Sequence, residues 1–159
     1  MNKIKVCIAF SAGGHYVEAM NACALLFHRQ DLEFTYVTYK NNPVKKNFRR
    51  GSVHYVTHPC HCFFVKRFGL FLRNFFDSLR FFLKHRPHVV ISTGADVTIG
   101  IMLIAKMFGS KLLYIETGAN VHGGSLTGKL SYRLADMFIV QWPEQLKQYP
   151  YAILGGALL

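Results

Sequence analysis

Apolar runs that fit β-strands alternate along this chain with apolar patterns that repeat at helical spacing. The first run covers residues 4–10 and leads through a Ser-Ala-Gly-Gly-His turn at 11–15 into a helical pattern. Further strands are predicted at 33–39, 52–57, 88–92, 111–115, 137–141 and 152–154, and further helices at about 97–108, 125–135 and just before Tyr149. This alternation predicts an α/β fold with a Rossmann-like open parallel sheet, in a single domain that spans residues 1–159.

Residues 63–86 carry the most unusual pattern, that of a strongly amphipathic basic helix. On a helical wheel most of its apolar residues fall on one arc, and the polar residues opposite include Asn74 and Asp77. Leu70 and Phe81 project from the basic side as well. Such a helix either packs its apolar arc on the sheet or lies on an anionic membrane surface. We expect membrane contact from Phe64, Arg67, Phe68, Phe71, Arg73, Phe75 and Phe81.

Three glycine-bearing turns follow predicted parallel strands, at the edge of the sheet where ligands bind in such folds. His15 falls in or near a first helical turn, where free N–H groups and the helix dipole favour an anion. Asp96 and Glu116 follow strands at the same edge, although Asp96 fits better as the start of a helix. The alternative for His15 is a residue that merely lies near a structural turn. The residues expected to bind phosphate are Ser11, Gly13, Gly14, Gly94 and Gly118.

The charge of the chain narrows the choice of partner. Nineteen Lys and Arg residues stand against eight acids, and the net charge of +11 indicates nucleic acid, an anionic membrane surface or a phosphate-bearing substrate. A hydrophobic content of 51% excludes a disordered chain. We expect no signal peptide, because residues 1–10 alternate like a strand and lead into the glycine turn. We expect no transmembrane helix, because no uncharged apolar stretch is long enough.

The four cysteines carry little chemistry. In a chain without an export signal they are expected to be reduced, as in the cytosol. A Cys-x-Cys pair with no second ligand pair is not a zinc spacing, so we expect no metal and no cofactor. The residues that could have suggested a metal site are His54, His58, Cys60, His61 and Cys62.

Five short motifs, in order along the chain, resemble the signatures of one family. They are Ser-x-Gly-Gly-His at 11–15, Ile-Ser-Thr-Gly-Ala at 91–95, Tyr-Ile-Glu at 114–116, Leu-Thr-Gly-Lys-Leu at 126–130 and Ala-Asp-Met-Phe-Ile-Val-Gln-Trp-Pro at 135–143. The family is the acceptor-side subunit of two-component glycosyltransferases. It includes bacterial PssD-like capsule and exopolysaccharide subunits and the anchoring subunit of the eukaryotic dolichol-pathway UDP-GlcNAc transferase. The chain is also similar to the N-terminal half of the peptidoglycan GlcNAc transferase, a GT-B enzyme.

This resemblance implies half of a GT-B glycosyltransferase that is inactive alone. The glycine turns would bind a polyprenyl- or dolichyl-(pyro)phosphate-linked saccharide at the cytoplasmic face of a membrane, with the chain peripherally associated. A second subunit would hold the UDP-sugar, from which GlcNAc or another hexose or hexuronic acid is transferred in polysaccharide or lipid-linked oligosaccharide biosynthesis. The eukaryotic members have an N-terminal membrane anchor that this sequence lacks, so the helix at 63–86 would take over that role.

Inverting sugar transfer needs a base for the acceptor hydroxyl. His15 and Glu116 are the catalytic candidates, and the sequence leaves open which is the base. His15 could instead orient the acceptor phosphate, and Glu116 could cap the loop that follows it. Apolar residues near the C-terminus are expected to contact the partner subunit, with core packing as the alternative. They are Trp142, Leu158 and Leu159.

The sequence is also compatible with two other functions. A basic chain with interleaved aromatic residues could be a nucleic-acid-binding module, although the Phe residues form a helical arc rather than a sheet platform. The other alternative keeps the fold and makes the chain a stand-alone small nucleotide-sugar enzyme. We expect no nucleic acid partner.

Overall fold

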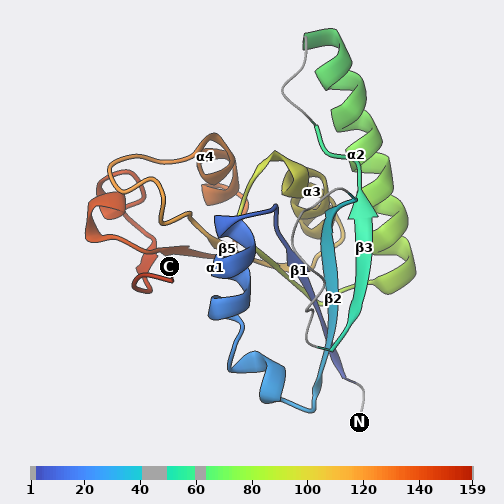
Figure 1. The fold of residues 1–159 in the computed structure, drawn as a ribbon, viewed down its shortest axis with the longest axis horizontal. Helices are drawn as coiled ribbons and strands as arrows, with labels where there is room; N and C mark the ends of the chain where they lie inside the picture. Colours follow the sequence, from blue (N-terminus) through green and yellow to red (C-terminus); the bar gives the residue numbers. More distant parts are fainter. Residues whose placement is uncertain (1–2, 41–49, 60–63, 159) are drawn as a thin grey trace.

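The computed structural model describes residues 3–40, 50–59 and 64–158, which form an open sheet with helices on both faces (Figure 1). All strand pairs are parallel, and the strand order is β3-β2-β1-β4-β5-β6-β7. The strands are β1 (Ile4–Ala9), β2 (Leu32–Tyr39), β3 (Ser52–Val56), β4 (Val89–Ser92), β5 (Lys111–Ile115), β6 (Met137–Val140) and β7 (Ile153–Leu154). The predicted α/β fold with an open parallel sheet is confirmed.

The order of the strands changes direction at β1. The chain first moves outward through β2 and β3, then returns to pair β4 with the other side of β1 and continues to β7. A crevice therefore opens at the carboxyl ends of β1 and β4, because the connections leave these two strands in opposite directions. The turns at 11–15 and 93–95 both follow these strands, so the fold brings them together.

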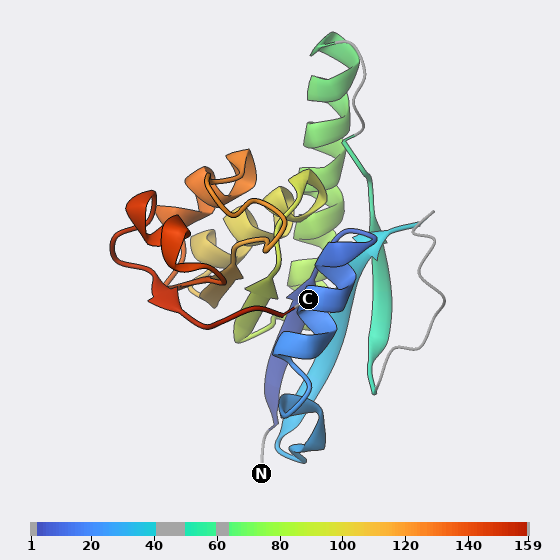
Figure 2. The same cartoon turned by 60° about the vertical axis from the view of Figure 1, so that its left-hand side comes forward.

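Helices cover both faces of the sheet. Helix α1 packs on one face, whereas α2 and α3 pack on the other, and each face has its own cluster of buried apolar side chains (Figures 1 and 2). The helices are α1 (Gly14–Ala22), α2 (Phe64–His85), α3 (Ile99–Met107) and α4 (Leu126–Tyr132), and the 3-10 helices are η1 (Leu26–His28), η2 (Asp96–Thr98) and η3 (Pro143–Lys147). The predicted helix at 97–108 thus begins as a 3-10 turn, and the short helix before Tyr149 is wholly 3-10.

The buried face of α2 differs from the one that the helical wheel predicts. Asn74 is fully buried and its Nδ2 donates to the Thr57 carbonyl at 2.7 Å and the Val97 carbonyl at 3.0 Å. Asp77 is half-buried, and its Oδ2 accepts from the backbone N–H of Thr57 at 2.9 Å. The side of α2 opposite the apolar arc thus turns partly inward, because carbonyls and N–H groups of neighbouring segments need polar partners there.

Phe81 also lies inside the protein, with only 5% of its surface exposed. Its ring stacks on His85 at 4.8 Å between centroids and contacts His54 at 5.0 Å. The prediction that Phe81 contacts a membrane is therefore wrong, since β3 and the last turn of α2 enclose it. Phe75 is partly buried against the core, and the side chain of Phe64 lies outside what the structure describes.

One side of α2 leaves large apolar side chains in solvent. This apolar ridge comprises Phe68 (62% exposed), Leu72 (46%), Phe76 (62%) and Leu83 (51%). The N-terminal turns of α2 project beyond the carboxyl edge of the sheet (Figure 1), and there the Arg67 guanidinium lies 5.6 Å from the centre of the Phe71 ring. Arg73 is exposed on the same helix. Within residues 3–40, 50–59 and 64–158, no helix combines the length and apolarity needed to span a bilayer.

Candidate functional site

His15 lies at the start of α1, in the crevice between the ends of β1 and β4. Its Nδ1 is 2.7 Å from the Thr93 carbonyl oxygen, and the Thr93 hydroxyl donates back to the His15 carbonyl at 2.8 Å. A carbonyl can only accept, so Nδ1 carries the proton and the neutral ring has its lone pair on Nε2. The side chain stays 27% exposed, which leaves an acceptor nitrogen at the edge where ligands bind in such sheets.

Glu18, one helical turn after His15, is a fully buried carboxylate. Its Oε2 lies 3.5 Å from His15 Nδ1 and has no hydrogen-bond partner among the described residues. Its Oε1 accepts from Gly118 N at 2.7 Å, from Gln141 Nε2 at 2.9 Å and from the Thr117 hydroxyl at 3.2 Å. A single carboxylate thus joins α1 to the segments that follow β5 and β6.

The side chains of His15 and Glu18 shift each other's pKa. Burial alone would lower the pKa of His15, but the Glu18 carboxylate, the Thr93 carbonyl and the charge of Glu116 together outweigh it, and the pKa of His15 lies above its usual range. Burial would raise the pKa of Glu18, but His15, the Gly118 N–H and Gln141 lower it below its usual range. The Glu18 carboxylate is therefore ionised near neutral pH, and its negative charge makes the His15 ring a better proton acceptor.

The glycines predicted to bind phosphate divide into two kinds. Gly13 has φ +66°, and a Cβ at Gly13 or Gly14 would meet nothing within 4 Å, so this backbone is open to a ligand. Gly94 and Gly118 are buried, and a Cβ would lie 2.6 Å from the Tyr114 hydroxyl or 2.8 Å from Gln141 Oε1. Close packing accounts for these two glycines, and Ser11 lies half-buried beside the open pair. Phosphate binding by all five residues stays a prediction.

Glu116 is fully buried at the end of β5. Its Oε2 accepts from the Tyr149 hydroxyl at 2.8 Å and its Oε1 from Thr117 N at 2.9 Å. A Cβ at Gly128 of α4 would overlap the same carboxylate. The catalytic role stays a prediction, and in this structure the carboxylate organises the segment after β5 rather than facing solvent.

Three residues of this network were not singled out in the sequence: Glu18, Gln141 and Gln145. Glu18 stands three residues after His15, a spacing that places two side chains on the same face of a helix. Gln141 belongs to the motif at 135–143, whereas Gln145 gives no signal of its own. Gln145 Nε2 donates to the carbonyls of Thr117 at 2.9 Å and Asn120 at 3.0 Å, which holds the loop after β5.

The C-terminal segment runs back across the sheet toward α1 (Figure 2). The Leu158 N–H donates to Gln141 Oε1 at 2.8 Å, and its carbonyl accepts from Asn21 Nδ2 at 2.7 Å. Trp142 is half-buried and its Nε1 donates to the Gly118 carbonyl at 2.8 Å. Trp142 and Leu158 thus have contacts within the chain, Leu159 lies outside the described residues, and contact of all three with a partner stays a prediction.

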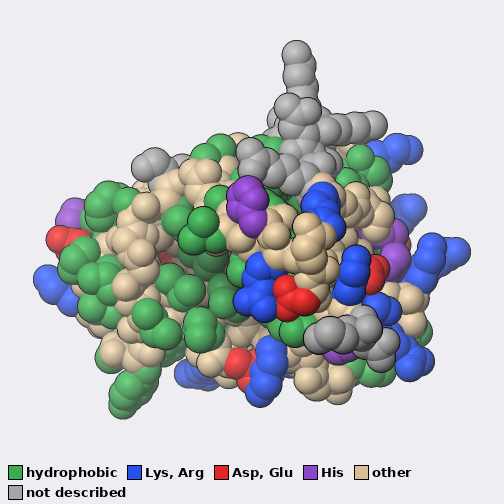
Figure 3. All heavy atoms as spheres, turned by 90° about the horizontal axis from the view of Figure 1, so that it is seen from below, with side chains coloured by type: hydrophobic (Ala, Val, Ile, Leu, Met, Phe, Trp, Pro, Cys, Tyr) green, Lys and Arg blue, Asp and Glu red, His purple; other side chains and the backbone are tan. Residues whose placement is uncertain are grey.

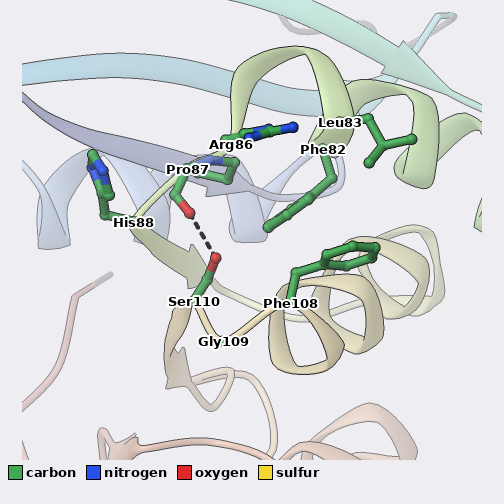
Figure 4. A pocket seen from close by; sticks show the side chains of 8 residues that line it. All are labelled: Phe82, Leu83, Arg86, Pro87, His88, Phe108, Gly109 and Ser110. Atoms are coloured by element: carbon green, nitrogen blue, oxygen red, sulfur yellow. Dashed lines mark hydrogen bonds between the residues drawn. The ribbon is translucent and has the colours of Figure 1, made fainter.

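A separate pocket of about 590 Å³ lies at the opposite, amino edge of the sheet (Figure 4). Its lining includes the rings of Phe82 and Phe108, whose centroids are 5.1 Å apart, together with Arg86. The Ser110 hydroxyl closes one side by donating to the Pro87 carbonyl at 2.6 Å. On this lower face the hydrophobic side chains gather on one half and most Lys and Arg side chains on the other (Figure 3). The pocket is remote from His15.

The cysteines that the structure describes are unreactive near neutral pH. Burial raises the pKa of Cys7 and Cys23 to about 12, so neither thiol ionises near neutral pH. In the described part of the chain, no three His, Cys, Asp or Glu side chains are placed to hold a metal ion. Residues 60–63, which carry part of the cluster considered for a metal, lie outside the described residues.

A parallel sheet that reverses at β1, with a glycine turn and a histidine at its carboxyl edge, defines a Rossmann-like domain. Among solved structures, MurG of Acinetobacter baumannii superposes with a TM-score of 0.69 at 17% identity, over 89% of this chain and 42% of MurG. The UDP-GlcNAc 2-epimerase of Neisseria meningitidis gives 0.66 at 12% identity, over 97% and 46%. At these identities the likeness is one of fold.

The chain belongs to the Alg14-like family, whose model "Oligosaccharide biosynthesis protein Alg14 like" matches residues 63–158. The UDP-N-acetylglucosamine transferase subunit ALG14 of Yarrowia lipolytica is 30% identical over 82 residues, or 48% of this chain and 38% of that protein. Human ALG14 is 32% identical over 89 residues, or 51% and 41%. The match therefore covers only about two fifths of each relative. The sequence resemblance to this family is confirmed.

Proposed function

We propose that this chain is the acceptor-binding subunit of a two-component glycosyltransferase. A partner subunit holds a UDP-sugar, and this chain presents a saccharide linked to a polyprenyl or dolichyl phosphate. The observation that carries the proposal is the His15–Glu18 pair beside an open glycine turn, in a chain of the Alg14-like family. Relatives that bear the name of a transferase subunit agree with a division of labour between two chains.

His15 Nε2 accepts the proton of the acceptor hydroxyl in this proposal. The hydroxyl oxygen attacks the anomeric carbon of the donor sugar, and the bond to the UDP leaving group breaks. Glu18 is a positioning residue, because its carboxylate stabilises the imidazolium that forms, while the Thr93 carbonyl keeps the proton of the neutral ring on Nδ1. Glu116 acts through its bond to Tyr149, which ties the end of β5 to the segment after η3.

The apolar ridge on α2 supports peripheral attachment to the cytoplasmic face of a membrane. Its four side chains fall within an arc of about 80°, at about 100° per helical residue. Arg73, Arg80 and Lys84 are exposed beside this arc. Rings in the acyl boundary and cations among anionic headgroups are the arrangement that binds a helix to a membrane surface.

The proposal is tested on the complex as cells contain it. A tagged chain is purified from its own cells with the proteins that accompany it, and is assayed for transfer from labelled UDP-GlcNAc and other UDP-sugars. The acceptors are polyprenyl-diphosphate saccharides in vesicles. We expect transfer by the complex and none by the chain separated from its companions. Turnover of a UDP-sugar by the separated chain, or no transfer by the complex with any donor, would refute the proposal.

A further inference from the structure

A second pocket, the β2–β3 pocket, lies at the carboxyl ends of β2 and β3 beside α2. Its volume is about 370 Å³, at the lower end of the range for small-molecule sites. It is lined by Tyr39, Lys40, Tyr55, Val56, Thr57, His58, Arg73 and Asp77. Because β1 to β4 are parallel neighbours, this pocket opens at the same edge of the sheet as His15.

The charges of the lining favour an anion. Lys40 and Arg73 are exposed, and neither takes part in an ion pair within the described part of the chain. The carboxylate in the lining, Asp77, has its Oδ2 occupied by the N–H and hydroxyl of Thr57 at 2.9 and 2.6 Å. His58 faces Asp96 at 3.6 Å, so this second carboxylate already has a partner. Within the described residues, Lys40 and Arg73 thus have no charged partner and can meet a ligand.

The pocket is connected to the turn that holds His15. Asp96, which pairs with His58, begins η2 directly after the turn whose Thr93 carbonyl accepts from His15. Neighbouring strands lie about 4.8 Å apart, so one to two strand spacings, roughly 5–10 Å, separate the end of β2 or β3 from the end of β1. That span matches the distance from a phosphate to a hydroxyl on the sugar it carries.

Above the pocket, the N-terminal turns of α2 extend past the sheet with Phe68 and Leu72 in solvent (Figure 1). A lipid chain leaving the pocket upward would therefore run along the apolar ridge. Tyr55, which is 45% exposed, and the half-buried Tyr39 add aromatic surface at the pocket itself. A cationic pocket thus shares the carboxyl edge of the sheet with a proton-accepting histidine, beside the helix that carries the apolar ridge.

We propose that the β2–β3 pocket binds the phosphate or diphosphate of an isoprenyl-linked substrate, with the Arg73 guanidinium and Lys40 ammonium as its ligands. Guanidinium groups bind phosphate oxygens in pairs, and an ammonium group adds a point charge. This inference rests on the proposed function and adds to it a location for the anionic group, apart from the glycine turn at 11–15.

The test is calorimetric titration of the purified complex with farnesyl diphosphate, inorganic pyrophosphate and farnesol. Arg73→Gln and Lys40→Gln should each weaken binding of farnesyl diphosphate about 5- to 10-fold, as the loss of one charge-assisted bond predicts. Arg80→Gln is the matched control, because Arg80 is exposed on the same helix but does not line the pocket. It should change the affinity less than twofold, and thermal unfolding should confirm that all three variants fold.

The probes separate the possible sources of the anion. Tighter binding of farnesyl diphosphate than of pyrophosphate supports a lipid-linked ligand, whereas equal binding overturns that part of the inference. Unchanged diphosphate binding in Arg73→Gln and Lys40→Gln overturns the pocket itself. If Arg73→Gln and Arg80→Gln weaken binding to phosphatidylglycerol vesicles equally while diphosphate binding is intact, the cations serve the membrane alone. Absence of sugar transfer with normal diphosphate binding would count against the proposed function and leave the pocket standing.

Discussion

The turn between β1 and α1 and the surface of α2 break the usual arrangement of polar and apolar residues in opposite ways. At the turn a carboxylate, Glu18, is fully buried with a histidine at its side. On α2 the polar Asn74 and Ser78 are fully buried while Phe68 and Phe76 are 62% exposed. Charged groups are rarely buried unless they are paired, and contiguous exposed apolar surface usually marks a binding site.

The two regions differ in whether their unusual side chains find partners within the described part of the chain. Glu18 finds hydrogen-bond donors within the chain, so the cost of its burial is offset, and the Thr93 carbonyl holds His15 in one tautomer. The apolar ridge has no such partner among the described residues. The first region has its partners within the chain, whereas the second leaves apolar surface for the membrane contact that we propose.

The largest expected effect comes from removing the base of the first region. His15→Ala should lower sugar transfer by the complex about 10²- to 10⁴-fold, the usual contribution of a general base. Steady-state rates with a saturating acceptor give the measurement. The exposed His28, the last residue of η1, is the control, and His28→Ala should keep the full rate. Full activity in His15→Ala would remove His15 from the chemistry.

The next effect contrasts two phenylalanines of α2. Phe81→Ala should lower the free energy of unfolding by about 3–5 kcal/mol, because it empties a buried site. Phe76→Ala should change it by less than about 0.5 kcal/mol, as for other exposed positions. Denaturant unfolding of both variants checks this, and equal losses would mean that the apolar ridge is also packed in solution.

The apolar ridge itself should matter for membranes rather than for stability. Burying an exposed phenylalanine gives roughly 1.5–3 kcal/mol, so the double variant Phe68→Ser/Phe76→Ser should bind anionic vesicles at least about tenfold more weakly. Leu25→Ser, at an 83% exposed position near the end of α1, is the control and should leave binding unchanged. Sedimentation with phosphatidylglycerol vesicles measures both, and equal behaviour would argue against attachment through α2.

The smallest effect expected is a displacement of the pH profile. Glu18 raises the pKa of His15, so Glu18→Gln should lower that pKa. A base works in its deprotonated form, and the acid limb of the rate profile should therefore move to lower pH in the variant. NMR titration of the His15 ring should show the same direction of shift without any substrate. A limb that stays in place would assign it to another group.

Most of the fold could be predicted because parallel strands that are buried on both faces appear in the sequence as short apolar runs. The glycine turn and His15 also follow from local pattern. The role of Glu18 could not be predicted in this way, because its hydrogen-bond partner Gly118 lies about one hundred residues later in the sequence.

The inner face of α2 could not be predicted from its hydrophobicity. A helical wheel weighs each side chain alone, whereas Asn74 is drawn inward by the carbonyls of Thr57 and Val97. Gly100 on α3 completes the arrangement, since a Cβ there would overlap Asn74 and lie 2.8 Å from the Ser78 hydroxyl. The contact between the two helices therefore depends on groups of other segments that the pattern of α2 does not contain.

Glu18 receives its hydrogen bonds from residues 100 and 123 positions further along the chain. During synthesis this carboxylate stays in water until Gly118 and then Gln141 have emerged from the ribosome. Contacts over such separations close slowly, because the entropy of a long loop is lost before the contact is gained. The carboxylate beside His15 is thus among the first groups to be made and among the last to gain its hydrogen-bond partners.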